Sequence, residues 1–327
     1  MRKDVKRACR RCARPFQWVC VSGLVCAHGG VSPPCRSSLS LSLGFHRQCT
    51  VHDFRNRAVP YRDGWRLQRE LRDAKVEEIK QTGKTQRDDA ILLQHSPVYT
   101  LGTASTTANL RFPFREEELL NPEADSEADK EEGTERSRPF DLYRIERGGE
   151  VTYHGPGQLV LYPILDLRAH QEDLHWYMRS LEEVGIRTLA RLGIPSPGRV
   201  EGLTGVWSGN EKYVAIGVKI RKWVTMHGLA LNVAPNLEGF DRIVPCGISD
   251  KAVGSVLKHR QRGGREVGAE ERTEMVEEAA NALLESFAEV FSVHLCGADG
   301  RTLRESQEVA EVGESERRRI DGWVSAK

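Results

Sequence analysis

The sequence has no long uninterrupted apolar run, no marked excess of either charge, and few cysteines beyond its first fifty residues. Its apolar runs fall short of the ~20 residues that a membrane-spanning helix requires, so we expect no stable membrane insertion. With 48 lysines and arginines against 47 aspartates and glutamates, the chain has no basic excess, and we expect no nucleic-acid partner. The 327 residues could form one large core or two modest ones.

Cysteines are concentrated near the start of the chain, and only Cys246 and Cys296 follow residue 49. This distribution excludes a disulfide framework for the body of the protein. Cys9 and Cys12 have the CxxC spacing of a zinc-ligand pair, but no second pair follows at a suitable distance. We therefore expect no metal site.

Residues 1–52 contain nine lysines and arginines and a single acid, Asp4. An arginine- and serine-rich, acid-poor start is typical of an organellar transit peptide, and we favour the mitochondrion with the plastid as the alternative. A competing interpretation takes residues 16–27 as the short apolar part of a secretory or two-part plastid signal.

The remaining chain is predicted to form one domain over residues 53–296, followed by a polar tail over 297–327. An acidic stretch over 115–138 has no apolar period and is predicted to be a solvated insertion loop. Apolar residues have helical spacing in three segments: 61–79, 172–192 and 275–291. Strand-like patterns occupy five others: 90–101, 141–149, 158–167, 212–220 and 224–233. Strands mixed with helices, without βαβ alternation, predict an α+β fold with a largely antiparallel sheet.

A glycine-rich segment, RGGEVTYHGPGQ, spans residues 147–158. Its spacing matches neither a dinucleotide-binding nor a P-loop motif, so it predicts no nucleotide site. The segment is either a simple turn or a place where backbone N–H groups approach a ligand such as an acyl thioester. His154 within it could act as a general base or pack in the core.

Lys212 has the same strand parity as the apolar residues Val214 and Val218, so it would lie at the end of a buried face. A lysine that loses solvation there is suited to proton transfer. Alternatively, the strand begins after residue 212 and the lysine is simply exposed.

Cys246 lies in a PCG turn, just before Ser249 and Asp250. These two residues are predicted to cap a helix over 251–257, whose macrodipole would favour the thiolate of a nearby cysteine. The alternative is a small buried cysteine with no chemical role.

Taken together, the segments resemble the lipoyl(octanoyl) transferase family, which has an RGGxVTxHGPGQL segment, a KxxxxG strand followed by HGLALN, and a PCG cysteine. Residues 147–159, 212–217, 227–232 and 245–247 match these motifs in order. The resemblance extends over about residues 59–291.

The resemblance implies a biotin/lipoyl protein ligase-like α+β fold and transfer of octanoyl from octanoyl-acyl carrier protein to a lysine of lipoyl domains, in 2-oxoacid dehydrogenases and the glycine cleavage H protein. It makes Cys246 the acyl-thioester nucleophile and Lys212 its proton-transfer partner. A thioester is already activated, so no cofactor, ATP or metal is expected. The acyl site implied by the match comprises Arg147, Gly148, Gly149, Glu150, Val151, Thr152, Tyr153, His154, Ala215, Ile216, Gly217, Gly228, Leu229 and Ala230.

Two other functions remain as alternatives. An ATP-dependent lipoate or biotin ligase would use a similar lysine but would need no PCG cysteine. A non-catalytic binder of acyl groups or lipoyl domains would have no reason to keep both Cys246 and Lys212.

Overall fold

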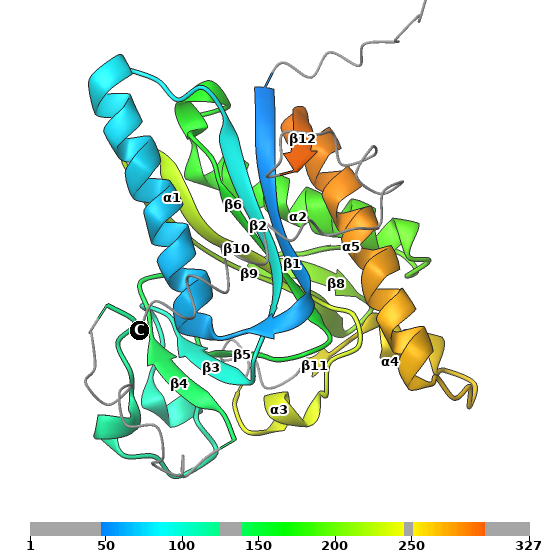
Figure 1. Cartoon of the computed structure of the whole chain (residues 1–327). Helices are drawn as coiled ribbons and strands as arrows, with labels where there is room; N and C mark the ends of the chain where they lie inside the picture. The colour runs from blue at the N-terminus through cyan, green and yellow to red at the C-terminus, as the bar shows by residue number, and fades with distance from the viewer. Residues whose placement is uncertain (1–46, 124–138, 245–250, 298–327) are drawn as a thin grey trace, which may run out of the picture. The chain divides into compact units, whose positions relative to one another are not determined.

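A computed structural model describes residues 47–123, 139–244 and 251–297 (Figure 1). The main sheet has the strand order β12-β1-β2-β6-β10-β9-β8-β7, with β11 paired to β9. Its strands are β1 (Arg47–Val59), β2 (Asp88–His95), β6 (Gln158–Ile164), β7 (Gly198–Val200), β8 (Leu203–Ser208), β9 (Glu211–Arg221), β10 (Val224–Asn232), β11 (Ala252–Val253) and β12 (Val293–Gly297). Within this main sheet, the described parallel pairs are β12–β1, β1–β2 and β11–β9, and its other described pairs are antiparallel. The predicted α+β fold with a mixed, largely antiparallel sheet is confirmed.

Helices cover both faces of this sheet (Figure 1). Helix α1 (Tyr61–Thr82) packs against β2, β6 and β10, whereas α2 (Leu174–Arg191) and α5 (Ala269–Phe291) pack together on the opposite face. Strand β6 is buried on both sides: Leu159 and Leu161 join the α2–α5 core, and Val160 and Tyr162 join a smaller core beneath α1. The three predicted helices are present. No helix in the described ranges combines the length and the apolar character needed to cross a membrane.

Helix α5 begins six residues earlier than its apolar pattern predicts. Its first turn carries the charged residues Glu270 and Glu271, which suit a helix N-terminus but contribute no apolar face. The buried stripe starts only at Met275. Apolar spacing therefore locates the packed part of this helix and omits its solvated first turns.

A second, three-stranded sheet has the order β4-β3-β5, formed by β3 (Val98–Leu101), β4 (Asp141–Arg144) and β5 (Thr152–His154). Its side chains form a separate core with α3 (Glu238–Asp241), against which Leu119 packs. Leu120 forms an isolated bridge with Tyr143. The predicted solvated loop over 115–138 is therefore wrong at its start, because two leucines among the acids anchor residues 119–120. Residues 124–138 lie outside the described structure.

The predicted helix over 251–257 is also wrong. Residues Ala252 and Val253 form β11, which adds in parallel to Glu211 and Lys212 of β9. The helix that follows is α4 (Val256–Arg260), and its N-cap is Ser255, whose side chain accepts a hydrogen bond from Lys258 N. Because residues 252–253 pair with the edge of β9, the helix begins five residues later than predicted. The helix-dipole argument for Cys246 loses its basis, and Cys246 itself lies outside the described residues.

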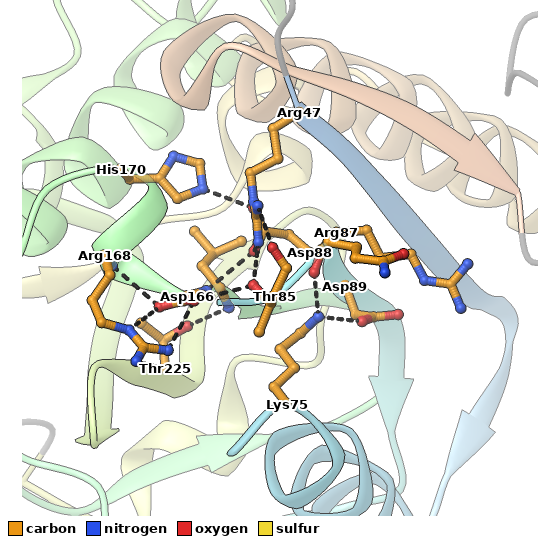
Figure 2. Close-up of polar contacts among 12 residues, drawn as sticks. Arg47, Lys75, Thr85, Arg87, Asp88, Asp89, Asp166, Arg168, His170 and Thr225 are labelled. Carbon is orange, nitrogen blue, oxygen red and sulfur yellow. Dashed lines mark hydrogen bonds and ion pairs between the residues drawn. The ribbon is translucent and has the colours of Figure 1, made fainter. Parts of the chain in front are cut away.

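A largely buried ionic network joins Arg47, at the start of β1, to Asp88, at the start of β2 (Figure 2). Asp88, fully buried in β2, accepts hydrogen bonds from Arg47 Nε at 2.6 Å and from the backbone N of Asp166 at 3.1 Å, and contacts His170 Nε2 at 2.7 Å. Arg47 was predicted to belong to the leader over 1–52. The predicted boundary is wrong for residues 47–52, because Arg47 and the buried Cys49 are components of β1.

Candidate active site

A cleft of about 790 Å³ opens between β9, the first half of α2, and the glycine-rich segment that follows β4. One end of the cleft contains Lys212 and Glu182. His227 also lines the cleft but lies farther along the sheet, because it pairs with Val218, six residues beyond Lys212 on β9. The apolar side chains that line the cleft include Val160, Leu174, Met178, Ile216, Val218 and Leu229. A cleft of this volume with many apolar lining residues can hold an aliphatic chain.

Lys212 lies within β9, which excludes the alternative in which the strand starts after it. Its side chain is half-buried and lines the cleft. Its Nζ atom lies 5.1 Å from the ring centroid of Trp207 on the neighbouring strand β8, within range of a cation–π contact. The backbone of Lys212 pairs with Val253, so the chain that emerges from the 245–250 segment lies beside this lysine. Strand pairing and the indole ring thus fix the ammonium at one end of the cleft.

Arg147 shapes the glycine-rich wall of the cleft. Its guanidinium donates hydrogen bonds to the backbone oxygens of Gly148, Glu150 and Thr100 at 2.8–3.0 Å, and to Thr100 Oγ1 at 2.8 Å. The loop closes tightly on the sheet, because a Cβ on Gly217 would lie 3.0 Å from both Gly148 O and Arg147 Cδ. The guanidinium is therefore used to hold the loop, and the loop presents its backbone to the cleft.

His154 belongs to a buried hydrogen-bonded chain. Its Nδ1 contacts Gln158 Oε1 at 2.6 Å, and Gln158 Nε2 donates to Asn232 Oδ1 at 2.9 Å. Since an amide oxygen only accepts, Nδ1 of His154 carries the proton. Burial, together with the neighbouring His95, lowers the pKa of His154 to about 3. Of the two predicted alternatives, a packed neutral histidine fits this environment better than a general base.

Sequence reasoning did not single out a second polar pair, Glu146 and His227. His227 Nε2 lies 3.6 Å from Glu146 Oε1, and no described residue forms a hydrogen bond with that nitrogen. Although burial alone would raise it, the pKa of Glu146 is lowered to about 2 by His227 and by the Trp65 N–H. His227 also has a φ of +58°, an unfavourable backbone conformation for a residue other than glycine. The HGLALN match contained His227, but nothing in the pattern paired it with Glu146.

Twelve of the fourteen residues predicted for the acyl site line the cleft: Arg147, Gly148, Gly149, Glu150, Thr152, His154, Ala215, Ile216, Gly217, Gly228, Leu229 and Ala230. The other two, Val151 and Tyr153, lie instead in the second core with Tyr99 and Phe240. Alternation along β5 explains the difference for Tyr153, because Thr152 and His154 take the cleft side. Within the described ranges, no group of three or more histidine, cysteine and acidic side chains is arranged to hold a metal ion.

Comparison with known proteins gives three kinds of match. The lipoyl protein ligase A/B catalytic domain model matches residues 60–288. The chain is 42% identical to the chloroplastic octanoyltransferase of Arabidopsis thaliana over 76% of its own length and 81% of that protein, and 49% identical to the octanoyltransferase of Synechocystis sp. over 61% and 75%. A crystal structure of lipoate-protein ligase A bound with ATP aligns with a TM-score of 0.47 at 17% identity, covering 80% of this chain and 91% of that one.

Proposed function

The chain belongs to the lipoyl protein ligase A/B catalytic family, among its octanoyltransferases, and we propose that it moves an octanoyl group from acyl carrier protein to a lysine of a lipoyl domain through a thioester on Cys246. It is an acyltransferase. The observation that best supports the chemistry is the placement of Lys212 at one end of a largely apolar cleft, beside the chain that follows Cys246.

The proposed reaction has two balanced steps. The Cys246 thiolate attacks the thioester carbonyl carbon, a new C–S bond forms, and the carrier's thiolate leaves and takes up a proton. The neutral amine of the acceptor lysine then attacks the acyl-cysteine, a C–N bond forms as the C–S bond breaks, and the Cys246 thiolate is released. The Lys212 ammonium would stabilise the Cys246 thiolate, give a proton to the leaving carrier thiolate in the first step, and take up the proton of the acceptor amine in the second.

The glycine-rich wall provides the remaining requirements. Backbone N–H groups can stabilise the oxyanion of each tetrahedral intermediate, and glycines allow that close approach. The apolar side chains that line the cleft would hold the hydrocarbon chain. We propose that the twelve predicted residues on the cleft form this acyl site, and that Val151 and Tyr153 support it from the second core.

Intact mass of the protein after mixing with octanoyl-acyl carrier protein and an acid quench tests the mechanism. An octanoyl adduct should form in the wild type and in Cys296→Ala, a matched change at the half-buried cysteine of β12. It should be absent in Cys246→Ala and should form at least about a hundredfold more slowly in Lys212→Ala. Added lipoyl domain should discharge it.

Other results would favour the alternatives. Modification of the lipoyl domain only with ATP and free octanoate would indicate a ligase, and binding without transfer would indicate a non-catalytic binder. Transfer at the normal rate by Cys246→Ala would overturn the acyl-cysteine.

The compartment is a separate proposal. The Arabidopsis thaliana relative is named as chloroplastic, and on that likeness we favour the plastid over the mitochondrion that the basic start alone suggested. Residues 1–60 fused to a fluorescent reporter should direct it to plastids. Import into mitochondria alone would reverse this assignment.

A further inference from the structure

A basic segment borders the Lys212 end of the cleft. Residues 251–265 contain five lysines and arginines and no aspartate or glutamate. The segment begins with β11, includes α4 and ends before α5. We refer to its five cations as the basic rim: Lys251, Lys258, Arg260, Arg262 and Arg265.

Several contacts hold the basic rim against the strand that carries Lys212. Lys258 and Arg262 both pair with Glu211, at 2.8 and 2.5 Å. Lys251 Nζ lies 5.7 Å from the centroid of the Trp207 ring, the same ring that Lys212 contacts. The rim therefore adjoins the reacting end of the cleft.

The basic rim has more cations than the carboxylates that pair with it. Its cations pair with three carboxylates: Glu211, Glu271 and Glu278. Lys251 instead donates to the neutral amide of Asn210 at 2.9 Å. The side chains of Lys258, Arg262 and Arg265 are 44%, 54% and 56% exposed, so they can reach a partner.

We propose that the basic rim is the docking surface for the acyl donor, an acidic carrier protein whose acyl group is borne on a phosphodiester-linked arm. This inference rests on the proposed function. Charge decides between the two carriers of that reaction: the donor's arm brings an anion to the cleft, whereas the acceptor brings a lysine that this surface would repel. Rim charges of this kind act mainly on the encounter rate and are screened by salt.

The test compares Arg262→Gln/Arg265→Gln with the wild-type full chain. Lys258 keeps its pair with Glu211 in this variant, so the start of β9 retains a partner. Lys80→Gln/Arg187→Gln is the matched control, since these exposed cations also pair with carboxylates but belong to α1 and α2. Acylation is followed by intact mass with octanoyl-acyl carrier protein and with octanoyl-pantetheine, which has no carrier. Binding of fluorescently labelled holo-acyl carrier protein is measured in parallel.

We expect acylation by octanoyl-acyl carrier protein to slow about three- to tenfold at low salt and the difference to shrink as salt rises. Octanoyl-pantetheine should react at the wild-type rate, and carrier binding should weaken in the rim variant alone. Unchanged carrier binding, equal slowing with both donors, or slowing confined to transfer onto the lipoyl domain would each overturn the assignment. If the wild type forms no adduct with either donor, the proposed function fails, and the binding measurement still decides the docking surface.

Discussion

A Cβ atom on Gly205 would lie 2.6 Å from Cε of Lys212. The same atom would lie 2.5 Å from the backbone oxygen of Val214, and Gly205 has a φ of +122°, which other residues rarely adopt. The Lys212 side chain therefore lies over a backbone position that only glycine can occupy without a shift. Glu182 also accepts a hydrogen bond from the Gly205 N–H, which fixes the strand there.

Gly205→Ala should lower activity more than a glycine replacement that only strains the backbone. We expect a loss of about 2–4 kcal/mol in unfolding free energy and a fall in the acylation rate, because Lys212 must leave Trp207. Gly209→Ala is the control, with a φ of +58° and open space around its Cβ. It should lose only about 1–2 kcal/mol and acylate normally. Urea titration and intact mass measure the two effects, and equal acylation by both variants would contradict the account.

The Glu146 carboxylate should make stability depend on pH. Its pKa is lowered from 4.5 to about 2, so its contribution is fully present above pH 4.5 and is lost as the pH falls toward 2. Urea unfolding of the wild type and Glu146→Gln should therefore differ most near neutral pH and converge only as the pH falls to about 2. A difference that stays constant across this range would show that Glu146 acts by shape alone.

Elements were predicted correctly where buried side chains recur at a regular spacing along the sequence. Helices α1 and α2 each have one apolar face, and both were predicted, as were the apolar strands β9 and β10. Strand β11 was missed because its two residues join the sheet through backbone groups, as in the bond from Gly254 N to Lys212 O, which leave no side-chain pattern. The Glu146–His227 contact joins residues far apart in the sequence, and local spacing contains no record of it. Arg47 was assigned to the leader because its partner, Asp88, lies 41 residues away in the sequence.

Neutralising Asp88 should destabilise the fold without changing the chemistry. Asp88→Asn removes the charge that faces Arg47 and His170 in the network of Figure 2. Loss of one partner from a buried ion pair costs about 3–5 kcal/mol, and we expect about 2–4 here because asparagine can still accept hydrogen bonds. Glu77→Gln is the control, at a pair with Lys80 whose two side chains are both exposed, and it should cost far less. Urea unfolding compares them, and equal losses would refute the role of burial.

The contribution of the first part of β1 can be tested by shortening the chain. Removal of residues 1–42 keeps all of β1, whereas removal of residues 1–52, the predicted leader, deletes Arg47–His52. That deletion exposes Asp88 and Asp89 without Arg47 and His52, removes the buried Cys49 and Val51, and leaves β12 without its neighbour. We expect the chain that starts at residue 43 to match the full-length protein in melting temperature and acylation rate. The chain that starts at residue 53 should melt at least about 10 °C lower or fail to fold, since burial and ion pairing are lost together. Equal stability of the two shortened chains would show that the sheet does not depend on the first part of β1.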